Sequence, residues 1–377
     1  MARGFLIMMV LVVLGVGASS AAADTVRIGV HLPLSGPNAF GGQLELEGVR
    51  LAHEEAGAVL GRKVELFVVD NKSEEVAAAN AVKHLIDTEH VQAIIGTYGS
   101  SLAMAGGEVA ERAGVPQVGT SCTNPLVTQG KKHVFRVCFI DPFQGAGAAT
   151  YAIKKLGMKK AAVLVNVAND YSRGLGNFFK RSFVNQGGEI VADLTCQSSD
   201  QDFTAHLMYA ISKNPDVLFI PVYFTEGAVI LKQAKALGAA FKIIGGDAMD
   251  NPEVITIAGP AAEGFMHTTF PYDPSMADMN PVAQKFTEDW RKKHPDQEPN
   301  VNAALGFDAY MLILDAIQRA GSVEPGKISA ALAETRGFLG VTGITTINKN
   351  HDAEKPVGIA VIQEGKRVYL GSIQPEL

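Results

Sequence analysis

The chain of 377 residues is long enough for two or three domains. Hydrophobic residues make up 47% of it and charged residues 19%, a composition that excludes a disordered chain. With a formal net charge of −6, we expect no basic surface that could bind the phosphate backbone of a nucleic acid, and therefore no nucleic-acid partner. Three cysteines are too few for a disulfide scaffold or a four-thiolate zinc site.

The first 23 residues have the layout of a secretory signal peptide. Arg3 precedes an apolar run over residues 5–16, and a stretch of small residues ends in an Ala-x-Ala site at 21–23. We therefore predict export and cleavage after Ala23, with an uncleaved anchor as the alternative. Later in the chain, no apolar stretch reaches the roughly 18 residues that a membrane-spanning helix needs.

After this leader, short apolar runs alternate with amphipathic segments. The pattern predicts strands, each but the last followed by a helix: 26–30 and 43–56, 64–70 and 74–88, 91–96 and 100–113, 161–165 and 173–186, 189–194 and 203–213, 217–222 and 227–237, and 242–246. Such alternation is typical of α/β folds, in which helices cover both faces of a parallel sheet. Together with the buried strand that precedes the turn at Ser121, these make at least eight strands before residue 250 and indicate two sheets, since about five or six strands per sheet are usual.

The last third of the chain has a different pattern. It predicts three successive helices at 281–293, 302–320 and 325–335, followed by a hairpin of strands 357–363 and 367–374. No linker rich in Gly, Ser or Pro separates the two expected lobes. We therefore expect several short connections between them.

Sequence signatures of enzymes are missing. The chain has no GxSxG, HExxH or CxxC motif and no P-loop, and no two of its nine histidines share ligand spacing on one expected helix. We accordingly expect no catalytic residues, no metal site and no cofactor. His31, after the first expected strand, is interpreted as a polar loop residue, or as part of a cleft. The pattern favours an exported α/β binding protein.

Two polar turns in the first half follow buried strands, at the edge where open α/β sheets bind ligands. In the first, Ser100 opens a helix whose unpaired N–H groups suit a carboxylate. In the second, Ser121 and Thr123 bring hydroxyl and backbone groups to the same edge. Helix capping is the alternative for these turns, by Ser100 in the first and by Thr123 or Asn124 in the second, and the sequence leaves it open.

Further turns of this kind follow strands in the second half. Segments 169–174, 221–227 and 245–248 supply the aromatic rings of Tyr171 and Tyr223 and the carboxylate of Asp247. An aspartate beside two glycines at a strand end could meet an ammonium group. It could equally cap the next helix.

An ordered set of motifs resembles the leucine/isoleucine/valine-binding proteins of ABC transporters. It runs from about residue 25 to the C-terminus and comprises HLPLSG (31–36), GVRLA (48–52), the turn at 96–100, SCTNP (121–125), YSRG (171–174) and AEGF (262–265). The resemblance implies the type I periplasmic binding fold, with two α/β lobes joined by three hinge crossings. Residues 24–141 and 271–345 would form the first lobe, and residues 142–270 and 346–377 the second.

The resemblance also implies how the polar groups would hold an amino acid between the lobes. Ser100 and Thr123 would bind its carboxylate. The carbonyl of Ser121 and the carboxylate of Asp247 would bind its ammonium group. The family often has Glu where this chain has Asp247, so the ammonium would sit deeper or be reached through water.

Aromatic residues would enclose the ligand. Tyr171 and Tyr223 would close over it from the second lobe, with Phe224 in place of Tyr223 if the register slips by one residue. Tyr98 and Phe40 would line the pocket for its side chain.

The resemblance implies a monomeric periplasmic protein that captures a branched-chain or other apolar amino acid and delivers it to an ABC permease in the inner membrane. Two alternatives remain: a sensor for amides, urea or aromatic acids on the same fold, and an exported hydrolase. Cys122 and Cys138, 16 residues apart, would either pair in an oxidising compartment or stay buried as thiols.

Overall fold

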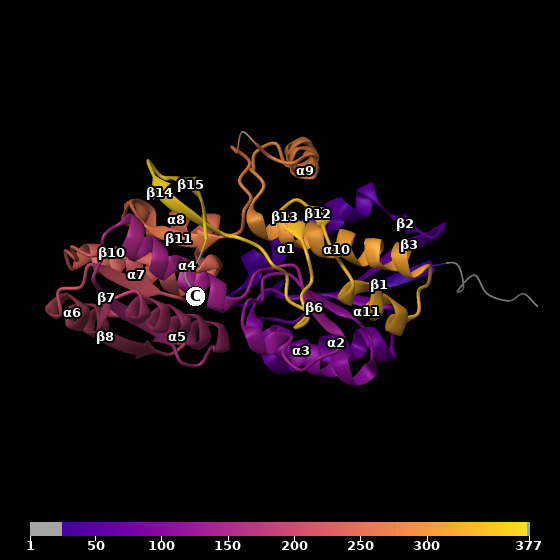
Figure 1. Cartoon of the computed structure of the whole chain (residues 1–377), viewed down its shortest axis with the longest axis horizontal. Helices are drawn as coiled ribbons and strands as arrows, with labels where there is room; N and C mark the ends of the chain where they lie inside the picture. Colours follow the sequence, from indigo (N-terminus) through magenta and orange to yellow (C-terminus); the bar gives the residue numbers. More distant parts are fainter. Residues whose placement is uncertain (1–24, 277, 375–377) are drawn as a thin grey trace, which may run out of the picture.

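The computed structural model describes residues 25–276 and 278–374, so the expected signal peptide lies outside the described residues. Its two large sheets form two bodies that lie side by side (Figure 1). This arrangement confirms the predicted α/β class. In the described part of the chain, no helix is both long and apolar enough to cross a membrane.

The first sheet has six strands and is parallel except for its short edge strand β2. Their spatial order is β2 (Ala58–Val59), β3 (Arg62–Asp70), β1 (Thr25–Leu32), β4 (Ala93–Ile95), β5 (Gln117–Gly119) and β6 (Val134–Arg136). Its helices are α1 (Ala39–Glu55), α2 (Glu75–Asp87) and α3 (Ser100–Ala113), joined later in the chain by α9 (Pro281–Lys293), α10 (Val301–Ala320) and α11 (Pro325–Ala333).

The second sheet has seven strands, and the hairpin from the end of the chain completes it in antiparallel fashion (yellow in Figure 1). Their order is β15 (Lys366–Ile373), β14 (Val357–Gln363), β11 (Met266–Thr269), β10 (Lys242–Gly245), β9 (Val217–Ile220), β7 (Lys160–Asn166) and β8 (Glu189–Cys196). Its helices are α4 (Asp141–Thr150), α5 (Asp170–Asn185), α6 (Thr204–Ser212), α7 (Phe224–Ala236) and α8 (Pro252–Ala258).

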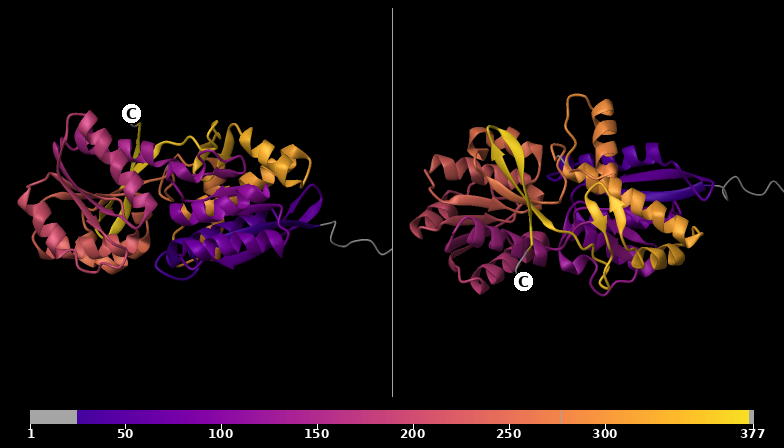
Figure 2. Two further views of the ribbon diagram at one scale, coloured as in Figure 1. Left: turned by 90° about the horizontal axis from the view of Figure 1, so that it is seen from below. Right: turned by 45° about the horizontal axis from the view of Figure 1, so that its top comes forward.

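The chain passes between the two sheets three times. The connections follow β6, β11 and the small hairpin of β12 (Phe338–Gly340) and β13 (Gly343–Thr345). Figure 2 shows these connecting segments between the two bodies. Short parallel connections of this kind permit rotation of one body against the other.

The close contact of α1 with α10 depends on two glycines. A Cβ atom on Gly48 would lie 1.8 Å from the carbonyl oxygen of Ala303, and one on Gly306 would lie 2.1 Å from that of Glu45. Each helix therefore needs glycine where the other approaches. The contact fixes α10, from the last third of the chain, on the first sheet.

One local interpretation from the sequence is wrong. His31 belongs to β1 and is completely buried, so it is neither a loop residue nor part of a cleft. A Cβ atom on Gly96 would lie 2.4 Å from its ring, and one on Gly106 would lie 2.8 Å from it. Burial lowers the pKa of His31 to about 4, so the imidazole is neutral at pH 7.

Candidate functional site

The expected binding residues lie where the strand ends of both sheets face each other. Ser100 and Tyr98 follow β4, and Ser121 and Thr123 follow β5. On the opposite side, Tyr171, Tyr223 and Asp247 follow β7, β9 and β10. Parallel strands bring such turns to one edge of their sheet, and the two edges meet here.

On the first-lobe side, hydrogen bonds join the two turns to each other. Ser100 is the first residue of α3, and its Oγ accepts a hydrogen bond from the Asn124 amide at 3.1 Å. The carbonyl of Ser121 accepts one from the Gly99 amide at 3.0 Å. The first N–H groups of α3 have no intrahelical acceptor, so this wall presents hydrogen-bond donors.

Gly99 makes the turn before α3 possible. Its φ of 101° lies in the region that favours glycine, and a Cβ atom there would lie 3.0 Å from the hydroxyl of Tyr223 in the other lobe. The glycine thus sets both the backbone of the turn and the close approach of the lobes at this point.

Glu45 supports the same wall from behind, and sequence reasoning did not identify it. Its side chain on α1 is completely buried and accepts hydrogen bonds from the hydroxyls of Thr120, at 2.6 Å, and Ser121. Burial raises the pKa of Glu45 to about 8, so the neutral acid predominates at pH 7. Glu45 therefore orients the turn after β5 without adding a full charge.

On the second-lobe side, Asp247 is a buried carboxylate with a fixed orientation. Its Oδ1 accepts hydrogen bonds from the Gln144 amide at 2.7 Å and from the Tyr171 hydroxyl at 2.9 Å. The Gln144 side-chain oxygen in turn accepts one from the Asp247 backbone amide at 3.2 Å. Burial raises the pKa of Asp247 to about 6, which leaves the carboxylate ionised at pH 7.

Asp141 is a second buried acid that sequence reasoning missed. It is the first residue of α4, where the chain leaves the first sheet, and it is inaccessible to solvent. Its carboxyl oxygens accept no hydrogen bond of good geometry within the described part of the chain, although the Thr123 hydroxyl lies close enough to act against the rise of its pKa. Burial and the nearby charge of Asp247 raise the pKa of Asp141 well above its usual range. A buried carboxyl with so few hydrogen bonds would be stabilised by a further donor.

Three tyrosine rings lie together between the walls. The ring centroid of Tyr223 is 5.8 Å from that of Tyr98 and 5.5 Å from that of Tyr171. The hydroxyl of Tyr98 donates to the carbonyl of Ala248 at 3.3 Å, a contact between the lobes. Phe40, near the start of α1, is half-buried and packs against the hydrophobic cores of both lobes.

Tyr223 and its neighbour Phe224 face different surroundings. Phe224 is buried in the core of the second lobe, whereas Tyr223 contacts the rings of Tyr98 and Tyr171. The register that places Tyr223 in the cleft therefore agrees with the packing.

The lobes also touch at the cleft mouth. The Ser101 hydroxyl donates to the Asp170 carboxylate at 3.1 Å, and the Asn124 side-chain amide donates to the Asp170 carbonyl at 2.8 Å. A cavity of about 370 Å³ lies beside these contacts and has walls from both lobes, including Asn38, Leu102 and Asn169. The structure is thus a closed arrangement with an opening at one side of the cleft.

No nucleophile–base pair is seen at Ser100 among the described residues. The hydrogen-bond partner of the Ser100 hydroxyl is a backbone amide, and no described histidine bonds to it. Within residues 25–276 and 278–374, no group of three or more His, Cys, Asp or Glu residues could hold a metal ion. Cys122 and Cys138 are buried free thiols in this structure.

The comparisons with known proteins agree with this geometry. The sequence profile of a family described as "Periplasmic binding protein" matches residues 25–367. The crystal structure of a leucine-binding protein, LivK, from Thermotoga maritima is 46% identical, with a TM-score of 0.90 over 93% of this chain and 99% of that one.

Two further solved structures extend the comparison. The branched-chain amino acid transporter substrate-binding protein LivJ of Streptococcus pneumoniae, in complex with isoleucine, is 31% identical, with a TM-score of 0.87 over 93% of this chain and 100% of that one. An ABC-transporter solute-binding protein of R. palustris, in complex with benzoate, is 25% identical, with a TM-score of 0.85 over 94% of this chain and 97% of that one.

Proposed function

Because the chain belongs to the periplasmic binding protein family, we propose that it is the solute-binding protein of an ABC importer and that it captures an apolar α-amino acid between its lobes. One observation carries this proposal above the others. Two buried acids, Asp247 and Asp141, stand beside the hydroxyl and backbone donors of the turns at Ser100 and Thr123. An ammonium group beside a carboxylate is the ligand chemistry that satisfies both sets.

In the proposed complex, the ligand carboxylate lies at the N-terminus of α3. Ser100 and Thr123 donate their hydroxyls, and the free N–H groups of the helix and its partial positive charge stabilise the anion. The carbonyl of Ser121, the carboxylate of Asp247 and a carboxyl oxygen of Asp141 accept from the ammonium group. Because neither carboxyl oxygen of Asp141 has a well-placed donor among the described residues, the ligand would supply one.

An apolar ligand side chain fits the aromatic surroundings. Tyr98 and Phe40 would contact it from the first lobe, and Tyr171 and Tyr223 would cover it from the second. Leucine-binding and isoleucine-bound neighbours at 46% and 31% identity favour a branched-chain side chain. The benzoate-bound neighbour, at 25% identity, keeps an aromatic acid as the second candidate. Such a ligand has no ammonium group for the two acids.

Closure follows from the division of contacts between the lobes, proposed as residues 24–141 with 271–345 and residues 142–270 with 346–377. The first lobe binds the carboxylate and, through the Ser121 carbonyl, the ammonium group. The second lobe adds Asp247 and the tyrosines only when the lobes meet. A ligand that contacts both lobes shifts the equilibrium toward the closed state. We propose that the closed monomer, exported to the periplasm after cleavage at Ala23, docks on an inner-membrane permease without covalent chemistry.

Calorimetric titration of the mature protein with leucine, isoleucine, valine, alanine, 4-methylpentanoate and benzoate tests this proposal. We expect at least one apolar amino acid to bind with a Kd below about 100 μM, near −5.5 kcal/mol. We expect 4-methylpentanoate, which is leucine without its ammonium group, to bind far more weakly. Tighter binding of benzoate or 4-methylpentanoate than of every amino acid would favour the sensor or transporter of organic acids.

A further inference from the structure

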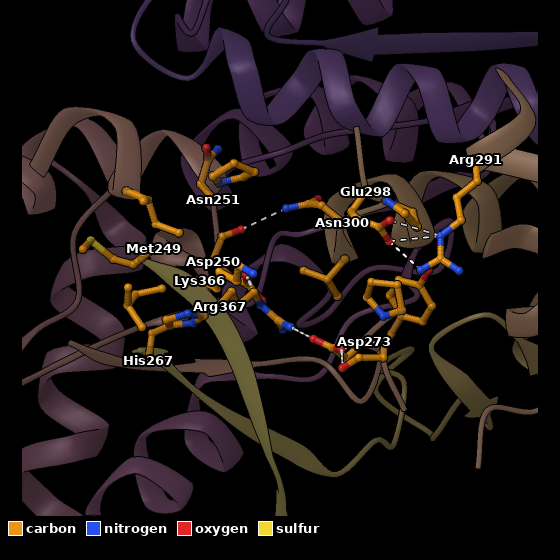
Figure 3. A pocket seen from close by; sticks show the side chains of 18 residues that line it. Met249, Asp250, Asn251, His267, Asp273, Arg291, Glu298, Asn300, Lys366 and Arg367 are labelled. Carbon is orange, nitrogen blue, oxygen red and sulfur yellow. Dashed lines mark hydrogen bonds and ion pairs between the residues drawn. The ribbon is translucent and has the colours of Figure 1, made fainter. Parts of the chain in front are cut away.

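A second cavity lies between the lobes, on the side where α8 faces the start of α10 (Figure 3). It encloses about 440 Å³, within the size range of small-molecule sites. None of the eight residues assigned to the cleft lines it among the described residues. We call it the α8–α10 cavity.

Its apolar walls come from both lobes. Met249 and Ile362 belong to the core of the second lobe, and Tyr272 and Val301 to the core of the first. Ile255 on α8 adds to the wall on the second-lobe side. The shape of the cavity therefore depends on how the lobes are placed relative to each other.

Polar contacts beside the cavity join the lobes. The side-chain amide of Asn300, just before α10, donates to the carbonyl of Asp250 at 3.2 Å. Arg367 on β15 binds the carboxylate of Asp250, with Nε 2.7 Å from Oδ1, and also binds Asp273 in the second crossing. Figure 3 shows Arg367 between these two acids. Both acids near the centre of the cavity are therefore already paired.

Two lining groups are donors without a partner in the part of the chain that the structure describes, whereas His267 adds an acceptor nitrogen, Nε2, because its Nδ1 donates to the Thr268 carbonyl at 3.2 Å. The first donor is Asn251, which is buried. Its Oδ1 accepts from the Glu253 amide at 2.9 Å, while its Nδ2 has no acceptor.

The second donor, Lys366, lines the rim, is exposed, and forms no ion pair with any described residue. Glu298, the acid at the opposite end, is paired with Arg291. Lys366 is therefore the one charged lining residue without an opposite charge among the described residues, and an anionic group at the rim would pair with it.

We propose that the α8–α10 cavity is a second binding site, for a small monocarboxylate with an apolar chain. The chain would lie between Met249, Ile255 and Tyr272, and the carboxylate would lie near Lys366. Because the walls belong to different lobes, a bound molecule would also favour the closed arrangement. Only this coupling rests on the proposed function, and the site itself does not.

Octanoate is a suitable probe of the mature protein, with binding followed by calorimetry. We expect saturable binding with a Kd below about 1 mM, near −4.1 kcal/mol. Ile255→Trp, which fills the cavity, should weaken it at least tenfold. Thr256→Trp on the exposed side of the same helix should leave it unchanged. No saturable binding, or equal binding to Ile255→Trp, would overturn the proposal.

Separate variants test the role of the Lys366 charge and the location of the octanoate site. Lys366→Gln should weaken octanoate binding about tenfold and leave octanamide binding unchanged. Lys232→Gln, at an exposed position of α7, should change neither. Ser100→Ala should leave octanoate binding intact. Loss of octanoate binding in Ser100→Ala would place the probe in the cleft and overturn the second site.

The coupling between the α8–α10 cavity and the cleft is measured with the amino acid that binds most tightly in the calorimetric titrations. Saturating octanoate should tighten its binding about fivefold, within the usual range of coupling between sites. Ile255→Trp should abolish this effect and keep amino-acid binding. Unchanged affinity would overturn the coupling alone. If no amino acid binds while octanoate does, the proposed function fails and the second site stands.

Discussion

The two walls of the cleft achieve recognition by different means. The first-lobe wall consists of turns in which hydroxyls, backbone groups and a helix N-terminus converge, supported by the neutral acid Glu45. The second-lobe wall consists of long side chains, the carboxylate of Asp247 and the rings of Tyr171 and Tyr223, fixed by Gln144. Backbone turns are suited to an anion, and the carboxylate is suited to a cation. The contrast predicts that variants of the two walls affect different parts of the ligand.

The largest effect is expected for the charge of the second-lobe wall. Asp247→Ala should weaken leucine about 100-fold and 4-methylpentanoate less than threefold, because hydrogen bonds to charged groups contribute about 1.5–3 kcal/mol and only leucine carries the ammonium. Calorimetry measures both values. Asp193→Asn, an exposed partner of Lys180, is the control and should change neither. An equal loss for both ligands would remove the ammonium role of Asp247.

The pH dependence comes next in size. Asp247 must be ionised to bind an ammonium group, and its pKa of about 6 in the free protein means that protons compete below that pH. Leucine should bind about tenfold more weakly at pH 5 than at pH 7. In Asp247→Asn this change should shrink to less than twofold. A profile that is flat from pH 7 to 5 in the parent protein would contradict the assignment.

The first-lobe wall should respond without regard to the ammonium. Ser100→Ala removes one hydroxyl donor to the carboxylate, so leucine and 4-methylpentanoate should each weaken about tenfold, near 1.4 kcal/mol. The control is Ser212→Ala at an exposed position, where the Ser212 hydroxyl donates to the Tyr209 carbonyl. If Ser100→Ala weakened leucine alone, the two walls would not divide the ligand as described.

The smallest effect on binding is expected for Glu45. In Glu45→Gln, the oxygen and nitrogen of the side-chain amide can still bond the two hydroxyls of the turn. This variant should change leucine affinity less than threefold. Glu45→Leu leaves the hydroxyls of Thr120 and Ser121 buried and unpaired, which should lower the free energy of unfolding by about 1–3 kcal/mol. Urea denaturation measures the free energy of unfolding of both variants. Equal stability of both variants would show that the turn does not depend on this support.

Much of the fold could be predicted from the sequence because its signals are local. The helix at 100–113 and the helix at 281–293 begin and end where expected, since glycine, serine and proline mark their ends. The helix at 43–56 begins earlier, at Ala39. Gly41 and Gly42 have low helix propensity, so the sequence does not indicate the first turn of this helix. In the structure, Tyr98 and Pro33 pack against these two glycines.

The parts of the site that escaped prediction depend on tertiary contacts. Asp141 precedes a proline at the start of a helix, so its sequence signal is that of a helix cap. Glu45 lies among alternating polar residues of α1, and its burial comes from tertiary contacts with α10 and with the turn after β5. Ser100, Thr123 and Asp247 were accessible to prediction because strand ends gather at one edge of a sheet. Their roles toward a ligand remain predictions.

One titration series tests most directly whether the two walls share a zwitterion. Leucine, 4-methylpentanoate and leucinol differ only in which charged group they keep, since leucinol has the ammonium without the carboxylate. We predict that leucine binds with a Kd below about 100 μM, and that each analogue binds at least about 30-fold more weakly, near 2 kcal/mol. Binding of either analogue as tight as that of leucine would contradict the account.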